Sequence, residues 1–372
     1  MNRRSFLLRA ASVSGSAGLL ASCSRGKRFT GYAFVANAEG GAVAAVDLGV
    51  LAVARYVRLN GNPTAVFAHP NRPFVYALTP NTGRVHEIGT GTLTLLRTTK
   101  VCDEAITMRL STDGASVYVL CQNPQRLVAL DTASLRIIWQ TQLPAASLDF
   151  EVDPGGEFLA VSHGASGKIS IVSTARRAVD HVISTGSETG LVCFRSDSKL
   201  LIAASPAERT LNFYRMPDGA LEVKLPLAVR PDHFCFKQDQ GQLFVTGDGM
   251  DAVVAVYPYF TPQIGGTVLA GHAPGAMAAS REFLFVANSK SGDVSVLNIE
   301  TQRVIAVAPA GANPSFIAIT PDNQYALVLN QASGDMGVIL IPSITRTRRR
   351  TASLFTMIPV GSSPVSAAVV QI

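Results

Sequence analysis

Charged residues are scarce in this sequence of 372 residues: 16% are Asp, Glu, Lys or Arg, against 47% hydrophobic residues. That balance excludes a disordered chain, which has too few apolar side chains to bury. The formal net charge is +6. Residues 1–22 contain three arginines and no acid, so the chain without them has 29 basic and 26 acidic residues, or +3. So small an excess is no electrostatic footprint for nucleic acid, and we predict no nucleic-acid partner.

The strong catalytic motifs are also missing. The sequence has no Gly-x-Ser-x-Gly elbow, no glycine-rich phosphate loop leading into a helix and no His-Glu-x-x-His. It has five cysteines, no Cys-x-x-Cys, and no cysteine spacing typical of a zinc site. These absences lean against an enzyme, although they do not exclude one. The sequence therefore assigns no catalytic residue and no metal ligand.

The first residues are typical of an export signal. Asn2–Leu8 resembles a twin-arginine signal, and a weakly apolar segment at Ala10–Ala21 is too short and too polar to span a membrane. Leu20–Cys23 resembles a bacterial lipobox; a plain secretory signal is the alternative. We predict a signal peptide over residues 1–22, lipidation of Cys23 and a linker over residues 23–31. The protein would then be exported, at the periplasm or cell surface, and anchored in a membrane by its acyl chains.

Disulfides are permitted in an exported protein. Cys102 lies in a turn, and Cys121 ends the strand that follows, on the same expected face, so we predict that these two form a disulfide. Cys193 and Cys235 occupy matching positions in consecutive repeats and are interpreted as small buried hydrophobic residues.

Helical periodicity is absent over any long window, whereas one strand pattern recurs. Short apolar runs bounded by Gly, Pro, Asn, Asp or Ser return about every 42 residues, the length of a four-stranded propeller blade. The first run of this unit occurs eight times: Tyr32–Asn37, Phe74–Thr79, Ser116–Cys121, Phe158–His163, Leu200–Ser205, Leu243–Gly247, Phe283–Asn288 and Tyr325–Asn330. We predict an all-β fold, a single closed β-propeller over residues 32–372. Eight blades are expected, or seven if the unit Leu200–Tyr214 is degenerate.

The ends of the chain predict how the ring closes. The mature chain starts with the first run of the unit, and it ends with an extra copy of the innermost strand at Val365–Ile372. A four-stranded sheet exposes two apolar faces and can bury both only between neighbours. We therefore expect the last strand to join the first blade.

Several of these motifs resemble the YVTN-type β-propeller repeat. They are Tyr32–Asn37, Phe285–Asn288 with Asp293–Val296, and Gly311–Pro314, and the resemblance extends over roughly residues 30–372. The WD-repeat pattern is absent, since the single Trp139 has no repeating Trp-Asp around it. The resemblance implies a propeller fold. The family includes surface proteins without known activity, and its wider neighbourhood includes lactonases and the haem d1-binding propellers of nitrite reductases and their maturation factors.

The turn after the first run and the turn before the innermost strand should emerge on one face, near the channel where propellers bind. The polar candidates for a binding site on this face are Arg230, Asp232, His233, His163, His272, Asp149, Glu188, Asp248 and Asn288. Arg230–His233 is the densest polar cluster and replaces the usual Gly-x-x-Pro turn. An imidazole at a channel mouth could be the axial ligand of a haem. Asp248 and Asp251 could ligate a divalent cation, with an Asx turn as the alternative.

The leading hypothesis is a monomeric scaffold that binds a protein, glycan or small ligand through this face. The first alternative is a propeller that binds or matures a haem d1-type cofactor. The second is a lactonase-like hydrolase, for which Glu188, Asp232, His233 and Arg230 could supply the base and the oxyanion stabiliser, although no spacing selects them. No cofactor is established by the sequence, and the repeat alone cannot separate these functions.

Overall fold

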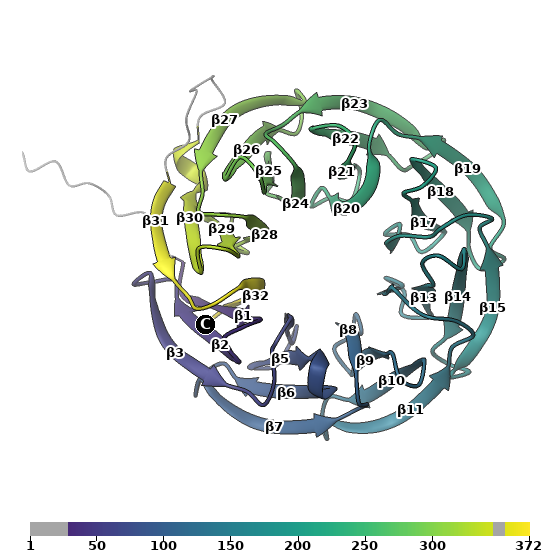
Figure 1. The fold of residues 1–372 in the computed structure, drawn as a ribbon, viewed down its shortest axis with the longest axis horizontal. Coiled ribbons are helices and arrows are strands. Elements are labelled where there is room, and N and C mark those ends of the chain that lie inside the picture. Colours follow the sequence, from purple (N-terminus) through teal and green to yellow (C-terminus); the bar gives the residue numbers. More distant parts are fainter. Residues whose placement is uncertain (1–28, 345–353) are drawn as a thin grey trace, which may run out of the picture.

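The computed structural model describes residues 29–344 and 354–372, so the predicted signal peptide and Cys23 lie outside the described residues. The described residues contain 32 strands in eight four-stranded antiparallel sheets. Figure 1 shows these sheets as the blades of one ring, viewed along its axis. The all-β propeller fold and the count of eight blades are confirmed. The predicted start of the propeller at residue 32 lies one residue after the start of the first strand, Gly31.

Each blade runs outward from the ring axis through four hydrogen-bonded strands. The innermost strands are β4 (Ala65–Ala68), β8 (Ala105–Leu110), β12 (Asp149–Val152), β16 (Val192–Phe194), β20 (Arg230–Phe236), β24 (Pro274–Ala279), β28 (Pro314–Ile319) and β32 (Pro364–Gln371). The second strands are β1 (Gly31–Asn37), β5 (Phe74–Thr79), β9 (Ser116–Cys121), β13 (Phe158–Ser162), β17 (Leu200–Ser205), β21 (Leu243–Asp248), β25 (Phe283–Asn288) and β29 (Tyr325–Asn330). The repeated apolar runs of the sequence are these second strands.

The outer half of each blade is equally regular. The third strands are β2 (Ala42–Asp47), β6 (Arg84–Gly89), β10 (Arg126–Asp131), β14 (Lys168–Ser173), β18 (Thr210–Arg215), β22 (Ala252–Tyr257), β26 (Asp293–Asn298) and β30 (Asp335–Leu340). The outermost strands are β3 (Ala52–Arg58), β7 (Thr94–Lys100), β11 (Arg136–Gln142), β15 (Ala178–Ser184), β19 (Leu221–Pro226), β23 (Gln263–Leu269), β27 (Arg303–Pro309) and β31 (Leu354–Pro359). The connections in the described part of the chain contain two single-turn 3-10 helices, η1 (Pro80–Thr82) and η2 (Ile341–Ser343).

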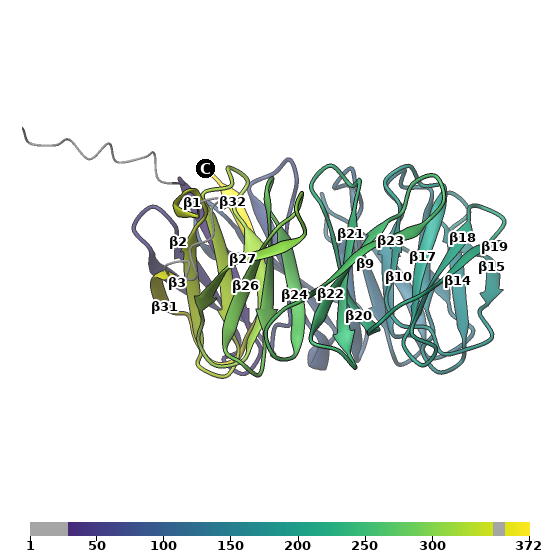
Figure 2. The same ribbon diagram turned by 90° about the horizontal axis from the view of Figure 1, so that it is seen from above.

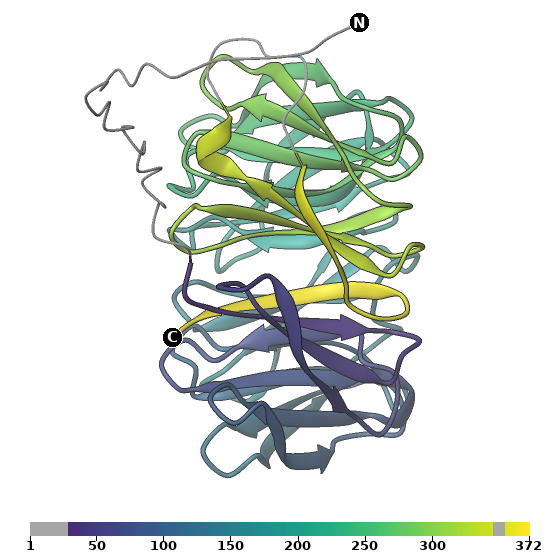
Figure 3. The same ribbon diagram turned by 90° about the vertical axis from the view of Figure 1, so that its left-hand side faces the viewer.

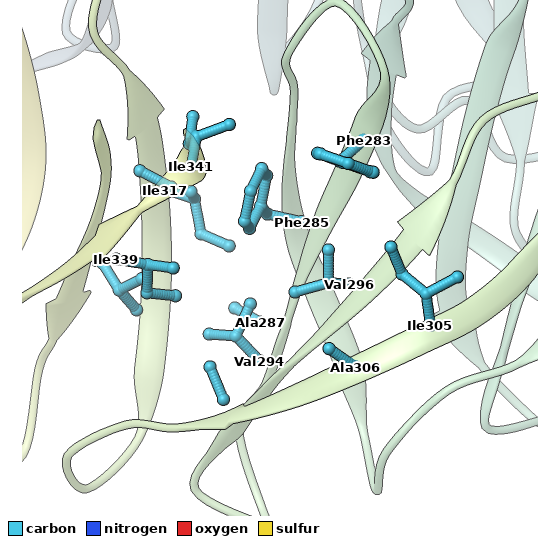
Figure 4. Packing of buried hydrophobic residues seen from close by; sticks show 13 residues of the cluster. Phe283, Phe285, Ala287, Val294, Val296, Ile305, Ala306, Ile317, Ile339 and Ile341 are labelled. Carbon is cyan, nitrogen blue, oxygen red and sulfur yellow. The ribbon is translucent and has the colours of Figure 1, made fainter. Parts of the chain in front are cut away.

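The core lies between the blades, which explains the composition of the strands. Second strands are mostly apolar because a neighbouring blade covers each face; every residue of β25 and β29 is buried, including the asparagine that ends each strand. A separate cluster of buried side chains fills each of the eight interfaces between neighbouring blades. Figure 4 shows one of them, where Phe285 of β25 and Val296 of β26 pack towards Ile317 and Ile339 of the next blade. Outermost strands face solvent and alternate instead.

The ring closes as the sequence predicts. Strand β32 pairs antiparallel with β1, in register from Gly31↔Gln371 to Ala36↔Ser366. Figure 3 shows the last strand, in yellow, lying beside the first, in purple. The amide of Ile372 also donates to the carbonyl oxygen of Thr30 at 3.1 Å. The first blade is therefore built from both ends of the described chain.

The predicted disulfide is present in the structure: Cys102 is joined to Cys121, with their Cα atoms 6.2 Å apart. It ties the entry of β8 to the end of β9. Cys193 and Cys235 are free and half buried. Within residues 29–344 and 354–372, no helix has the length and apolar character needed to cross a membrane.

Candidate binding site at the channel mouth

The ring has two faces, which Figure 2 shows edge-on with hairpin turns along both. We call one of them the mouth face. It carries the turns between second and third strands together with the connections that lead into the innermost strands. Backbone hydrogen bonds join the two kinds of segment, for example from the amide of Leu59 to the carbonyl of Gly41 at 2.9 Å and from Val101 to Gly83 at 2.8 Å. The sequence-based choice of a shared face therefore agrees with the topology.

One position on this face repeats in every blade, at the mouth end of the second strand. Seven of its eight residues have polar or sulfur-containing side chains and are at most 2% exposed: Asn37, Thr79, Cys121, His163, Ser205, Asn288 and Asn330. We call it the turn-closing position, because the side chain bonds within or next to its own hairpin. Asn288 Nδ2 donates to Asp293 Oδ1 at 2.6 Å and to Ser295 Oγ at 2.9 Å.

Two candidate residues fall at the turn-closing position and are not open to a ligand. His163 is 2% exposed. Its Nε2 lies 2.7 Å from Ser170 Oγ and its Nδ1 lies 3.2 Å from the carbonyl oxygen of Ala146. Burial lowers the pKa of this imidazole, so it is neutral and structural at ordinary pH. Asn288 is fully buried, and its side-chain amide donates the two hydrogen bonds described above. The structure thus removes His163 and Asn288 from the set of ligand-facing candidates.

The sixth blade breaks the repeat, because its turn-closing residue is Gly247. The innermost strand β20 pairs Pro231 with Gly247 and Arg230 with Asp248. A Cβ atom on Gly247 would lie 1.7 Å from the carbonyl oxygen of Arg230, so this close pairing requires glycine. Beyond it, Asp248 is exposed rather than buried under a turn. The mouth end of this hairpin is therefore open to solvent.

A register skip in the same strand turns Asp232 out of the sheet. Four other innermost strands skip at the equivalent place in the described residues, and the residues skipped there are Val365, Ile106, Gly275 with Ala276, and Ser315. None of those is charged. The side chains of Asp232 and His233 are 73% and 41% exposed and approach each other to 3.5 Å. The densest polar cluster of the sequence thus faces solvent at the mouth.

Three adjoining hollows surround this place. The rim pocket, of about 550 Å³, lies between the sixth and seventh blades, and its ionisable lining residues are Asp232, His233, Asp248, Asp251, His272 and Lys290. The entrance pocket, of about 640 Å³, is lined by Asp149, Glu188, Arg230, Asp232 and Asp248 among others. The channel pocket, of about 610 Å³, is lined by Arg109, Asp149, Glu151, Cys193 and His233 together with apolar side chains. Shared lining residues, such as Asp232 and Asp149, show that the three hollows adjoin one another.

Seven of the nine candidate residues therefore line these adjoining hollows, since only His163 and Asn288 do not. In the rim pocket, His272 Nδ1 lies 2.8 Å from Asp251 Oδ2, and the amide of Ala273 donates to Asp251 Oδ1 at 2.9 Å. These two bonds hold the pKa of Asp251 below its ordinary value, and the bond from the Ala273 amide contributes most. Asp251 is thus committed to its neighbours, and no group of three His, Cys, Asp or Glu side chains in the described residues is arranged to hold a metal ion.

Sequence reasoning missed Arg109 and Glu151, which face each other in the channel wall. Arg109 Nη2 lies 3.1 Å from Asp149 Oδ1, and its Nε lies 3.4 Å from Glu151 Oε2. The signal that could have found them is their separation of 42 residues, one repeat, which puts them at the same register in adjacent blades. Burial raises the pKa of Asp149 and of Glu151, although Arg109 opposes the shift in both.

Comparison with known proteins supports the fold and nothing finer. No protein-family model and no curated protein matches the chain. Among solved structures, it is similar to one described as dihydro-heme d1 dehydrogenase NirN in complex with DHE (TM-score 0.73, 15% identity, 92% of this chain and 76% of that one). It is also similar to apo AztD from Citrobacter koseri (TM-score 0.70, 11% identity, 92% and 98% of the two chains). A functionally unknown protein from Desulfotomaculum acetoxidans gives a TM-score of 0.64 at 14% identity, over 80% of this chain and 99% of that one.

The raised carboxyl pKa in the channel wall predicts a pH-dependent effect of Glu151→Gln. Because the pKa of Glu151 is raised above its ordinary 4.5, its contribution to stability is fully present below about pH 4.5 and is lost as the pH rises through the raised pKa. The Glu151→Gln variant cannot ionise and escapes that loss. Its melting temperature minus that of the wild type should increase by roughly 1–3 °C between about pH 4 and about pH 7.5.

The matched control is Glu39→Gln, which removes a carboxylate from an exposed turn of the mouth face. Its difference from the wild type should vary less with pH. A difference for Glu151→Gln that is constant, or that decreases towards neutral pH, would contradict the assignment of a desolvated carboxylate at this position.

Proposed function

We propose that this protein is an exported, lipid-anchored propeller of the YVTN-like kind that binds a small ligand, as a monomer, through the mouth of its channel. The observation that carries the proposal is the group of three adjoining hollows, the rim, entrance and channel pockets. Each hollow has a volume between about 550 and 640 Å³, within the usual range of small-molecule sites, roughly 300–1,000 Å³.

The break in the repeat at the sixth blade supports the same location for the binding site. Seven blades close their mouth turns with a buried side chain, whereas the sixth opens its turn and exposes Asp232, His233 and Asp248. Polar groups displayed on a rigid scaffold, without a role in the turn itself, are typical of binding sites. No catalytic constellation is assigned, and the proposed protein is a binder rather than an enzyme.

A plug in the channel tests the proposal. Ser315 lines the channel pocket at the register skip of β28, so Ser315→Trp should fill part of the pocket. After equilibrium dialysis against a small-molecule extract of the native host, mass spectrometry should find compounds enriched by the wild type. We expect Ser315→Trp to lower that enrichment at least tenfold.

The control variant is Val50→Trp, which adds the same side chain to an exposed turn on the opposite face. It should enrich the same compounds as the wild type. Equal enrichment by Ser315→Trp and the wild type would place the ligand site elsewhere or remove it.

A haem-type ligand is the second candidate, and the arrangement of His272 favours it. Its side chain is 60% exposed in the rim pocket, and its Nδ1 is engaged by Asp251. A carboxylate that accepts from Nδ1 leaves the lone pair of Nε2 for a metal, which is how metal-ligating histidines are usually oriented. The residues present therefore fit one axial bond to a haem, with Asp251 holding the ring. The structural likeness to NirN, whose structure contains DHE, is consistent with this candidate.

Titration with hemin tests the haem candidate. A shifted Soret band should form with the wild type and be lost with His272→Ala, because the axial nitrogen is removed. The control is His181→Ala, which removes a half-buried imidazole from the outermost strand β15. A band that survives unchanged in His272→Ala and in His233→Ala would eliminate this candidate.

The anchor is supported by the sequence alone, since Cys23 lies outside the described residues. The wild-type chain should incorporate labelled palmitate in its native host and partition with membranes, because two or more acyl chains bind stably. The Cys23→Ser variant should lose both the label and the partitioning. Labelling of that variant at the wild-type level would refute lipidation at Cys23.

A further inference from the structure

The wall of the channel pocket carries an unbalanced charge. Arg109 of β8 faces Asp149 and Glu151 of β12, so one guanidinium forms ion pairs with two carboxylates. Cys193, the next ionisable group along the wall, stays a neutral thiol because burial raises its pKa. His233 of β20 also lines the pocket. Counting the guanidinium as +1 and each of the two carboxylates as −1, the wall has a formal charge of −1.

The single cation belongs to the wall and cannot turn to a ligand. Arg109 Nη1 donates to Thr107 Oγ1 at 2.9 Å and to the carbonyl oxygen of Met108 at 3.0 Å. Its guanidinium carbon lies 5.7 Å from the ring centres of both Phe67 and Phe150, close enough for cation–π attraction. Two carboxylates, two hydrogen-bond acceptors and two rings therefore fix its position.

Glu151 is the carboxylate that is held least. Its Oε2 has only a long contact of 3.4 Å with Arg109, and its Oε1 accepts from its neighbouring backbone amide at 3.3 Å. Its side chain is 35% exposed to the pocket, whereas that of Asp149 is 14% exposed. Within the channel pocket, Glu151 is therefore the carboxylate with more of its side chain available to a ligand.

Apart from Ser315, the rest of the channel pocket is lined by apolar residues. Its lining includes Phe234, Phe236, Met277, Phe316 and Ile317. Such a wall supplies few oxygen or nitrogen ligands, so a bare divalent cation would lack the six or more that it prefers. An anion would be repelled by the excess negative charge. An organic cation satisfies both parts of the pocket, because its charge meets the carboxylates and its body covers the aromatic and aliphatic side chains.

We propose that the channel pocket binds an organic cation, whose charged group lies against Glu151 and Asp149 and whose apolar body packs on Phe234, Phe316 and Met277. This inference rests on the proposed function and specifies the class of its ligand. The hollows that lead to the channel pocket are also negatively charged. The three hollows together are lined by six acidic side chains and three from Arg or Lys, a net charge of −3 on a chain of net charge +6. Electrostatic attraction would draw cations towards the mouth.

A pair of probes of nearly equal size and shape separates charge from shape. Tetraphenylphosphonium is a cation with an apolar body, and tetraphenylborate is the matching anion. In isothermal titration calorimetry with the wild-type protein at neutral pH, the phosphonium should bind at least tenfold more tightly than the borate. Tetramethylammonium, which has the charge without the large body, should also bind at least tenfold more weakly than the phosphonium.

The Glu151→Gln variant should lose about tenfold in affinity for tetraphenylphosphonium and almost none for tetraphenylborate. The matched control, Glu39→Gln, lies on the mouth face but lines none of the three hollows, and it should bind both probes like the wild type. The comparison of the two probes on the wild type needs no variant, so it decides the question even if Glu151→Gln folds poorly.

Equal affinity for the two probes, failure of the phosphonium to bind, or an unchanged affinity in Glu151→Gln would overturn the inference. The proposed function fails separately. If Ser315→Trp still abolishes enrichment of compounds from the extract while the two probes bind equally, the channel binds ligands of another charge and only the inference about cations falls. If Ser315→Trp changes nothing, the channel is not the site.

Discussion

Ring closure is the constraint on which the other features of this structure depend. A blade has two apolar faces, and neither end of an open row of blades would have a neighbour for its outer face. Pairing of β32 with β1 supplies that neighbour and brings together the core cluster shared by the first and eighth blades. Closing a loop of this length costs roughly 5 kcal/mol in chain entropy. Burial of two or three core side chains, at about 1.5–3 kcal/mol each, offsets that cost.

A closed ring also determines where a ligand could bind. Eight similar blades place equivalent residues at the same height around one axis, so a departure in one blade becomes a local change in the mouth. Here the departure is in the sixth blade, where Gly247 replaces a buried turn-closing side chain and the register skip exposes Asp232. Two adjacent blades add Arg109 and Glu151 at a shared register. The proposed binding site thus depends on residues that differ between blades, while the stability of the ring depends on the packing that all blades share.

The sequence was informative wherever local chemistry repeats. Apolar runs such as Phe283–Asn288 gave the strands, their spacing gave eight blades, and the spare strand at Val365–Ile372 gave the closure, because turn chemistry and strand patterning are local properties. The choice of face also followed, since it depends only on connectivity. Seven of the nine candidate residues line the three adjoining hollows.

The failures have physical reasons. His163 was interpreted as accessible, although its register matches that of Asn37, a buried turn-closing residue; polarity alone does not distinguish a turn residue from a ligand. Arg109 and Glu151 were missed because they lie within innermost strands and not in turns. Which side of an innermost strand faces the channel depends on register skips such as that at Ile106, and skips depend on tertiary packing more than on local sequence.

Hydrogen exchange of the backbone amides of β32, followed in the intact protein by mass spectrometry, tests the closure most directly. If the last strand completes the first blade, its paired amides should exchange only through global unfolding, with the same opening free energy as those of β1 and β2. Exchange of β32 at the rate of a fraying terminus, while β1 and β2 remain protected, would contradict the closed ring.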